Sequence, residues 1–398
     1  ESDIREVIKV SGERSGYLLN SYELDQLTSR INSTRSFLGI LSPLQQDLNI
    51  SDIVVRGYNK VEYQRGRKNY RTAITFASQQ DYEAFVERLL SSGNKSCSVK
   101  VPIVDLMLDQ NTRVNVVHQS IAQGGPFITI RFNRFEEVSI ETLIESGLAP
   151  RFVIEYLSLA VKAGLTVLIA GEVGTGKTTL GRALASNIKQ DESILVIEDT
   201  PEIRIAHPHV RHLVSRTDNS EGVGKIGPAD CIRAGMRMAM SRIIFGEIRD
   251  SEAAEAFVDV CSSGHAGLST IHARTAEDAV TRMELFLGRA QRGASSEIFQ
   301  QQISSAVQIV VHLNFCRISG KRRVMQVKEL GRVIDGRIKQ TPIFSYYHLN
   351  QPRWRLDHRL SNFRDKFSEL DSAFSFSSCP DELCLVEARV GEDGSAWR

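Results

Sequence analysis

The sequence predicts an α/β protein in which a mainly parallel sheet, covered by helices on both faces, follows a smaller α/β domain. Between residues 165 and 345, apolar runs typical of buried strands alternate with segments of helical period, which favours a parallel sheet. Residues 51–72 instead alternate over short runs broken by turn residues, as in a meander of strands. The length of 398 residues is sufficient for two or three domains with a large buried core.

The order of elements divides the chain into four parts. The first domain, 1–135, begins with a polar helical segment over 1–45, and its later elements are a helix at 78–92 and strands at 99–108, 113–118 and 127–132. Residues 136–164 are predicted to be a linker with a connecting helix. In the second domain, 165–345, strands are expected at 166–170, 193–197, 211–215, 242–246, 267–271 and 307–313, and helices at about 177–188, 228–240, 251–262, 276–289 and 296–305. A β-ribbon over 322–345 closes this domain, and residues 346–398, which lack periodicity, are predicted to be an irregular, mobile tail.

Charge and composition exclude several classes of protein. The chain has 49 basic and 48 acidic side chains, so its net charge of +1 gives no basic excess for stable nucleic-acid binding. No apolar run approaches the ~20 residues of a membrane span, and the charged opening segment does not resemble a signal peptide. The first residue is Glu rather than Met, which is compatible with a processed or truncated start. Six scattered cysteines without a C-x-x-C pair indicate a reduced, cytoplasmic setting and no zinc site.

Residues 171–178 read Gly-Glu-Val-Gly-Thr-Gly-Lys-Thr, which is the phosphate-loop pattern between an apolar run and a helical segment. Such a loop points its N–H groups at phosphate oxygens, so the sequence predicts binding of a nucleoside triphosphate. Lys177 would reach the β- and γ-phosphates, and the hydroxyl of Thr178 would bind Mg²⁺. A glycine-rich turn with an incidental lysine is the alternative, which the flanking strand and helix disfavour. The predicted nucleotide-binding residues are Gly171, Glu172, Val173, Gly174, Thr175, Gly176, Lys177, Thr178 and Thr179.

Two carboxylates follow strands at the edge where ligands bind in open α/β sheets. Glu198, which ends one apolar segment and precedes Asp199, is a candidate for polarising an attacking water; a helix or turn cap is the alternative. Glu247 follows Gly246, at a position where most phosphate-loop proteins place an Asp that holds the Mg²⁺ shell. Glu247 would therefore serve as the metal-binding carboxylate, directly or through water.

Histidines and arginines supply further candidates. His265 and His272 bracket the segment 266–271, and their spacing of seven is not typical of metal ligands, so they are hypothesised to sense the γ-phosphate. Arg113, Arg131 and Arg134 lie on or beside strands of the first domain and are hypothesised to cover the phosphates or to reach a neighbouring subunit. The alternatives are structural histidines and solvated surface arginines.

Taken in order, these motifs resemble those of the secretion-superfamily ATPases, the hexameric motors of type II secretion, type IV and Tad/Flp pilus assembly, and type IV secretion. The resemblance covers about residues 50–345 and is closest to the Tad/Flp pilus and type IV secretion branch. It rests on Arg113-Val-Asn115, Gly125-Pro-Phe-Ile-Thr-Ile-Arg131, the phosphate loop, Ile197-Glu-Asp-Thr-Pro-Glu202, Gly246-Glu-Ile-Arg249 and Gly264-His-Ala-Gly-Leu-Ser-Thr-Ile-His272.

The resemblance implies a RecA-like ATPase domain with a smaller PAS-like N-terminal domain, in a hexameric ring that hydrolyses MgATP. It implies an inner-membrane platform protein as partner, a location at the inner face of the cytoplasmic membrane and, near residues 135–150, a hinge. The implied catalytic residues are Lys177, Glu198, Glu247, His265, His272, Arg113, Arg131 and Arg134.

One departure from the family leaves two alternatives open. The family has Arg-Pro-Asp where this chain has Ala239-Met240-Ser241, and Arg233, Arg237 and Arg242 are the nearby cations that would compensate. The alternatives to a secretion motor are a RecA-like ring motor acting on nucleic acid and a nucleotide-dependent switch with little turnover.

Overall fold

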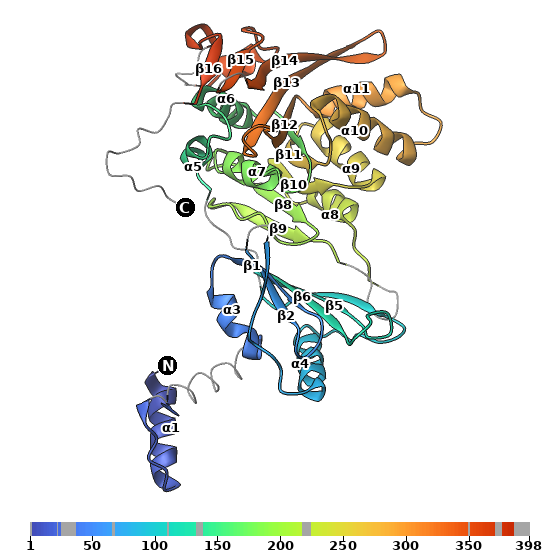
Figure 1. Cartoon of the computed structure of the whole chain (residues 1–398). Helices are drawn as coiled ribbons and strands as arrows, with labels where there is room; N and C mark the ends of the chain where they lie inside the picture. The colour runs from blue at the N-terminus through green and yellow to red at the C-terminus, as the bar shows by residue number, and fades with distance from the viewer. Residues whose placement is uncertain are drawn as a thin grey trace, which may run out of the picture. The chain divides into compact units, whose positions relative to one another are not determined.

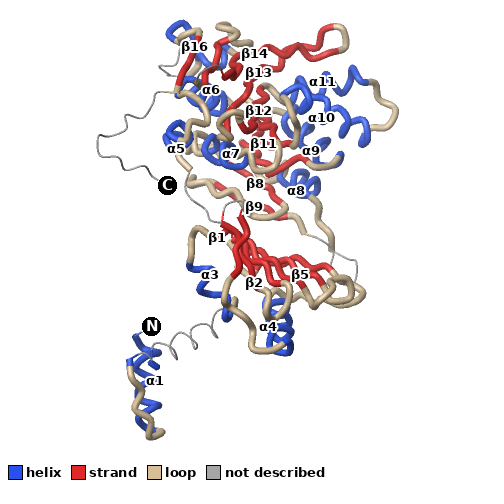
Figure 2. Tube along the Cα trace, viewed as in Figure 1, coloured by secondary structure: helices blue, strands red, loops and turns tan. Residues whose placement is uncertain are grey.

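The structure, a computed structural model, describes residues 2–21, 23–24, 37–65, 68–109, 111–132, 138–216, 224–348, 351–370 and 376–385 (Figures 1 and 2). The chain divides into two compact units, Glu1–Glu136 and Glu137–Arg398. Within the described ranges, no helix has the length and apolar character that crossing a membrane requires.

The first unit is a six-stranded antiparallel sheet with the strand order β3-β2-β1-β6-β5-β4. Its strands are β1 (Ile50–Val55), β2 (Val61–Arg65), β3 (Lys68–Arg71), β4 (Ile103–Met107), β5 (Thr112–Val117) and β6 (Phe127–Phe132). Its helices are α1 (Ser2–Arg14), the short η1 (Gly39–Leu41), α3 (Ser42–Gln46) and α4 (Gln79–Ser92).

Helix α4 supplies the core of this unit. Ser78 caps the helix by accepting the N–H of Asp81 at 3.1 Å, and Tyr82, Phe85 and Leu89 are buried against the sheet. Because side chains alternate along each strand, the residues between the buried ones gather on the opposite face. We call this second surface, which carries Asp52, Glu62, Asp105, Arg113 and Arg131, the polar face.

The second unit is a ten-stranded sheet with the order β16-β15-β14-β13-β12-β7-β11-β10-β8-β9. The strands from β12 to β9 in this order run parallel, as predicted. They are β7 (Val167–Gly171), β8 (Ile194–Glu198), β9 (Val210–Val214), β10 (Arg242–Ile248), β11 (Ala266–Ile271) and β12 (Ile309–Phe315). The antiparallel ones are β13 (Arg322–Ile334), β14 (Arg337–His348), β15 (Pro352–Leu356) and β16 (Glu382–Cys384).

Helices cover both faces of this sheet, so each face has its own apolar core (Figure 1). On one face lie α5 (Ile140–Glu145), α6 (Arg151–Lys162) and α7 (Lys177–Ala185). On the other lie α8 (Pro228–Gly235), α9 (Ser251–Ser262), α10 (Ala276–Ala290) and α11 (Ser296–Ala306). A short α12 (Arg364–Ser368) and η2 (Phe376–Ser378) complete the described elements of the unit. This confirms the predicted α/β class with a mainly parallel sheet.

The predicted linker over 136–164 is corrected in part. Its described residues form α5 and α6, whose apolar side chains are buried in the core of the second unit, with Val153, Ile154 and Tyr156 fully buried. The predicted hinge near 135–150 therefore overlaps a packed helix, and residues 133–137 lie outside the described residues.

The described part of 346–398 is not an irregular tail. Strands β15 and β16 extend the sheet, and Trp354 is fully buried and donates its indole N–H to the carbonyl of Val324 at 2.7 Å. Ser361 and Tyr156 both donate hydroxyl hydrogen bonds to the buried carboxylate of Glu329. The elements are only three to five residues long, too short to show a period in the sequence, and only their packing stabilises them.

Candidate active site

The phosphate loop joins the end of β7 to the start of α7. Gly176 has φ +97°, a left-handed conformation that favours glycine. A Cβ at Gly171 would lie 2.6 Å from both the carbonyl oxygen of Leu313 and the hydroxyl of Thr175, so no larger residue fits. Thr178 and Thr179 lie in the first turn of α7, where unpaired backbone N–H groups favour anions. The predicted loop is therefore built as a phosphate cradle.

Lys177 is the first residue of α7, and its side chain folds back over the loop. Its ammonium donates to the carbonyl oxygens of Gly171 and Glu172, at 3.0 Å each. Burial lowers the pKa of Lys177, while the nearby carboxylate of Glu247 opposes that shift. The lysine is thus held at the loop beside a carboxylate.

Glu247 and His272 meet Lys177 at the carboxyl edge of the sheet. Nε2 of His272 lies 2.6 Å from Oε1 of Glu247, and its Nδ1 lies 3.5 Å from the Lys177 ammonium. Burial and the lysine charge both lower the pKa of His272. Since β7, β10 and β11 are parallel neighbours, their carboxyl ends bring these three residues together. We call them the phosphate-loop cluster.

Two arginines that were not predicted as site residues also contact this site. Arg249 donates its Nε to Glu247 at 2.7 Å, and its Nη1 lies 3.3 Å from Asp199, so it links the two acidic segments. Arg322 donates its Nε to the carbonyl of Gly174 at 2.9 Å. Arg249 belongs to a motif that the sequence shows, whereas Arg322 reaches the loop because β13 pairs with β12, which lies beside β7.

Glu198 lies at the same edge, where one of its carboxylate oxygens accepts two backbone N–H groups. Its Oε1 accepts the backbone N–H groups of Glu202 and Ile203, at 2.9 Å each, so it caps the turn after β8. This is the turn cap that the sequence left as the alternative. Burial raises the pKa of Glu198 to about 7, and the two N–H groups oppose that shift. A carboxylate that titrates near neutral pH also suits a general base.

The raised pKa predicts a pH-dependent gain in stability for Glu198→Gln. Glutamine can still accept both N–H groups but carries no charge. Below the ordinary pKa of 4.5, Glu198 is protonated in both the folded and the unfolded chain, so its burial does not lower the free energy of unfolding through charge. Above about pH 7 it is ionised in both states, and the buried charge lowers the free energy of unfolding by its full amount. Urea unfolding at pH 8 should therefore show the variant more stable by up to about 3 kcal/mol, with the gain vanishing near pH 4.5. The exposed neighbour Glu202→Gln is the control, and an equal gain at both pH values would contradict the prediction.

The structure does not bring His265 to the cluster. His265 immediately precedes β11, whereas His272 immediately follows it, so the whole strand of six residues separates them. Because β11 is parallel to β7, His265 lies at the edge opposite the phosphate loop of its own subunit. The nearby hydroxyl of Ser263 lies 3.2 Å from its Nδ1. Within a subunit, only His272 therefore lies where the hypothesised γ-phosphate sensor is required.

Residues 239–241, where this chain has Ala-Met-Ser in place of the family's Arg-Pro-Asp, also lie at that opposite edge, directly before β10. The predicted helix 228–240 ends at Gly235, where a Cβ would lie 2.4 Å from Leu195, and β10 begins at Arg242. Arg242 is buried and paired with Glu192. Arg233 pairs with Asp230. Neither arginine replaces a missing cation at the phosphate loop of the same subunit.

The arginines of the first unit pair with carboxylates on its polar face. Arg113 lies opposite Arg131 on the neighbouring strand. Nη2 of Arg113 lies 3.4 Å from Asp105, and Nε of Arg131 lies 2.9 Å from Asp52. Arg131 is therefore ion-paired although 58% of its side chain is exposed. Arg134 lies outside the described residues.

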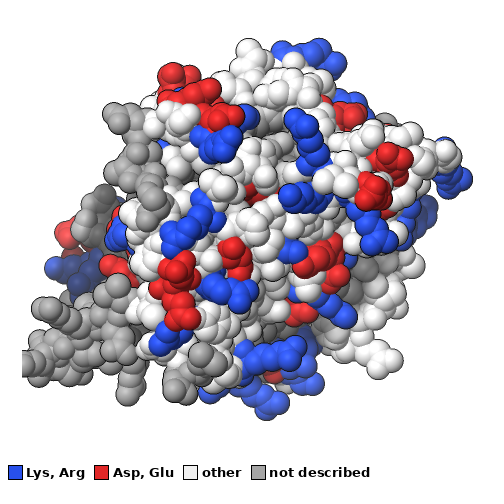
Figure 3. Space-filling view, turned by 90° about the horizontal axis from the view of Figure 1, so that it is seen from above, with Lys and Arg blue, Asp and Glu red and all other residues white. Residues whose placement is uncertain are grey.

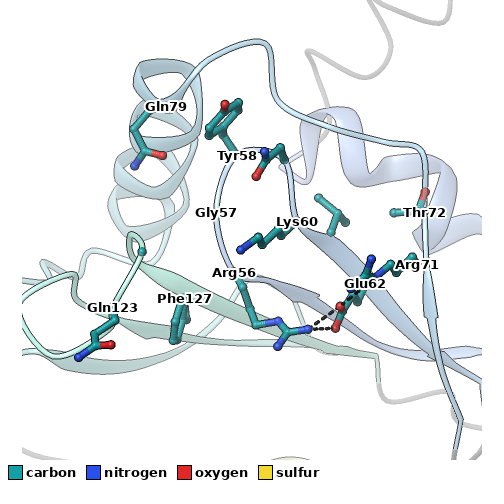
Figure 4. Close-up of a pocket in the computed structure, with 13 residues that line it drawn as sticks. Arg56, Gly57, Tyr58, Lys60, Glu62, Arg71, Thr72, Gln79, Gln123 and Phe127 are labelled. Atoms are coloured by element: carbon teal, nitrogen blue, oxygen red, sulfur yellow. Dashed lines mark hydrogen bonds and ion pairs between the residues drawn. The ribbon is translucent and has the colours of Figure 1, made fainter.

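The first unit also contains a cavity of about 570 Å³ that includes none of the predicted site residues (Figure 4). It lies between the β1–β2 turn, the start of α4 and the loop before β6. Glu62 holds the guanidinium of Arg56 at its wall. The cavity shares no residue with the phosphate-loop cluster, which lies in the second unit.

The donor set at the phosphate loop fits Mg²⁺. One hydroxyl (Thr178) and one carboxylate (Glu247) accompany the loop, which is what a magnesium ion held mainly by water and nucleotide phosphates requires. Within the described ranges, no group of three or more His, Cys, Asp or Glu side chains forms a separate metal site.

Comparisons with known proteins agree with this geometry. A family model described as "Type II/IV secretion system protein" matches residues 40–340. The type IV secretion system protein VirB11 of Bartonella quintana is 28% identical over 346 residues, which cover 77% of this chain and 95% of the relative. The type IV secretion system protein PtlH of Bordetella pertussis is 42% identical over 134 residues, 33% of this chain and 39% of the relative.

Two solved structures share the fold. The Legionella pneumophila ATPase DotB has a TM-score of 0.50 at 17% identity, covering 83% of this chain and 82% of that chain. The pilus retraction motor PilT with bound ADP has a TM-score of 0.52 at 19% identity, covering 71% and 80%. The predicted fold class, a RecA-like phosphate-loop domain with a smaller N-terminal domain, is confirmed. With its family model matched over 40–340 and its phosphate loop assembled, the chain belongs to the type II/IV secretion system protein family and is an ATP hydrolase of that family.

Proposed function

We propose that this chain hydrolyses MgATP to ADP and phosphate as a hexameric ring, and thereby powers pilus assembly or the secretion of protein or DNA across the bacterial envelope. The observation that carries the proposal is the phosphate-loop cluster, in which Lys177, Glu247 and His272 converge on one loop. Phosphoryl transfer needs mainly positioning and charge stabilisation, which such a cluster supplies.

Each residue of the cluster has a proposed part in the reaction. The loop N–H groups and Lys177 hold the β- and γ-phosphates. His272, with its lowered pKa, stays largely neutral and relays the state of the γ-phosphate to Glu247. Arg249 fixes the orientation of the Glu247 carboxylate through its 2.7 Å bond. When bound, Mg²⁺ would neutralise phosphate charge beside Thr178 and Glu247.

Two further groups complete the proposed reaction. Glu198 orients the attacking water from the neighbouring strand end, with its carboxylate ionised above about pH 7. Arg113, Arg131 and Arg134 stabilise charge on the γ-phosphate when the two units move against each other during turnover. A cation that arrives only on closure stabilises the transition state more than the bound substrate.

The proposed partner is an inner-membrane platform protein, at the inner face of the cytoplasmic membrane. VirB11 and PtlH are named as type IV secretion system proteins, and PilT as a pilus motor, which supports work at the cell envelope. Basic and acidic side chains are interspersed over the described part of the face in Figure 3, which shows no continuous basic track for nucleic acid, and the net charge is +1.

The proposal predicts that the purified chain assembles into a hexamer and releases phosphate from MgATP. Light scattering with a non-hydrolysable ATP analogue should give a mass near six chains, because nucleotide would bridge groups of neighbouring subunits. Phosphate release should need magnesium and should not rise when DNA is added. A monomer at high concentration, or turnover that depends on DNA, would contradict the hexameric secretion motor. Nucleotide binding without phosphate release would indicate a switch instead.

A further inference from the structure

Two arginines of the first unit lie directly opposite each other on neighbouring strands. Arg113 of β5 pairs in register with Arg131 of β6, so both side chains leave the sheet on its polar face. Like charges in directly opposed positions destabilise a sheet. In the described part of the chain, Asp105 from β4 lies beside Arg113, and Asp52 from β1 lies beside Arg131.

The two pairs differ in how firmly they hold the arginine. The Arg113–Asp105 contact is 3.4 Å, and the Asp105 side chain is 50% exposed and also accepts from Asn115. The Arg131–Asp52 contact is 2.9 Å, and the Asp52 side chain is only 9% exposed. Asp52 lies mid-strand, paired with Arg131 across the ladder. A buried carboxylate on a paired strand has little freedom, so Asp52 fixes its partner whereas Asp105 does not.

We propose that Asp52 is a positioning residue that aims Arg131 at a phosphoryl group. The bond uses Nε of Arg131, and the terminal nitrogens of this arginine make no contact with other side chains in the described part of the chain. A guanidinium is planar and rigid, so fixing Nε also fixes the direction of the remaining donors. Those donors form the fork that binds phosphoryl oxygens in pairs. The inference rests on the proposed function, in which Arg131 meets the γ-phosphate.

The steady-state test compares Asp52→Ala, Arg131→Ala and the double variant in the full chain with MgATP. Asp52→Ala should lower kcat about tenfold to a hundredfold, as loss of orientation does, while KM for ATP changes by less than about twofold. Asp52→Asn should retain part of the rate, because its amide oxygen still accepts from Nε. The control is Glu62→Ala, which removes another arginine-paired carboxylate from the same polar face and should leave kcat unchanged.

Thermal unfolding separates positioning from simple charge neutralisation. Arg131→Ala leaves the Asp52 carboxylate buried without its partner, so the midpoint temperature should fall. The double variant removes that carboxylate and should recover the midpoint, while its kcat stays as low as that of Arg131→Ala alone. Recovery of stability without recovery of turnover is the result expected of a positioning pair.

Two results would overturn the inference and keep the proposed function. One is normal turnover in Asp52→Ala when Arg131→Ala is slow. The other is a double variant whose loss in kcat equals the product of the two single losses, since Asp52 would then act independently of Arg131. Normal turnover in Arg131→Ala would overturn the proposed role of the arginine together with the inference. A wild-type chain that releases no phosphate would overturn the proposed function itself.

Discussion

Lys177→Ala is expected to abolish tight ATP binding and to lower phosphate release by at least ~10²-fold, the loss typical of removing one preorganised charge from an active site. Its ammonium lies within 3.0 Å of two loop carbonyls and beside Glu247. Arg322 also donates to the loop, at the carbonyl of Gly174, but it comes from β13 and not from the loop or α7. Alanine therefore leaves the β- and γ-phosphates without their lysine.

The measurement is nucleotide affinity together with steady-state phosphate release in magnesium. Lys189→Ala, which removes an exposed lysine beyond the end of α7, is the matched control and should behave as wild type. Unchanged turnover in Lys177→Ala would show that the phosphate loop is not the site of hydrolysis. The fold should survive, because the aliphatic part of Lys177 is replaced by a good helix former at the first position of α7.

Glu247→Gln is expected to keep ATP binding and to lose about 10²–10³-fold in turnover, with a weaker dependence on magnesium. The carboxylate lies between His272, at 2.6 Å, and Arg249, at 2.7 Å. A neutral amide cannot balance the charge of Arg249 and Lys177 and is a poorer ligand for Mg²⁺. The loss should therefore fall on kcat more than on nucleotide affinity.

Magnesium titrations of phosphate release, with nucleotide affinity measured in parallel, test this variant. Glu252→Gln, an exposed carboxylate in the first turn of α9, is the control. Glu198→Gln belongs in the same series, because it should also bind ATP and lose hydrolysis if Glu198 orients water. Normal hydrolysis in Glu198→Gln, beside an inactive Glu247→Gln that still binds ATP, would mean that Glu247 orients the water and Glu198 only caps its turn.

Much of the second unit could be predicted from the sequence because its strands are buried on both faces. Residues 167–170 are all apolar, as in a strand that is buried on both faces. The glycines and the lysine that follow them have the spacing of a phosphate loop. Parallel strands end at one edge, so the meeting of Lys177, Glu247 and His272 follows from the order of apolar runs alone. The same reasoning, applied to the two ends of β11, would have placed His265 at the opposite edge, contrary to the hypothesis that it senses the γ-phosphate.

Contacts between residues far apart in the sequence were not predictable in this way. Arg322 reaches the loop only because a hairpin folds back beside β7, and nothing in its local sequence indicates this partner. Asp52 and Arg131 are paired across 79 positions, and the register of two strands decides which acid meets which arginine. A shift of one residue would place each on the other face.

The sequence by itself determined the class of fold, the nucleotide loop and the family, because these depend on local spacing and on apolar periodicity. Tertiary structure alone decided which partners the side chains meet. Glu198 caps a turn, Arg242 pairs with Glu192 at the far edge of the sheet, and the described residues 351–370 and 376–385 pack around Trp354. The physical reason is that burial and pairing depend on neighbours brought together by the fold, and a carboxylate has the same local sequence signature whether it caps, pairs or polarises water.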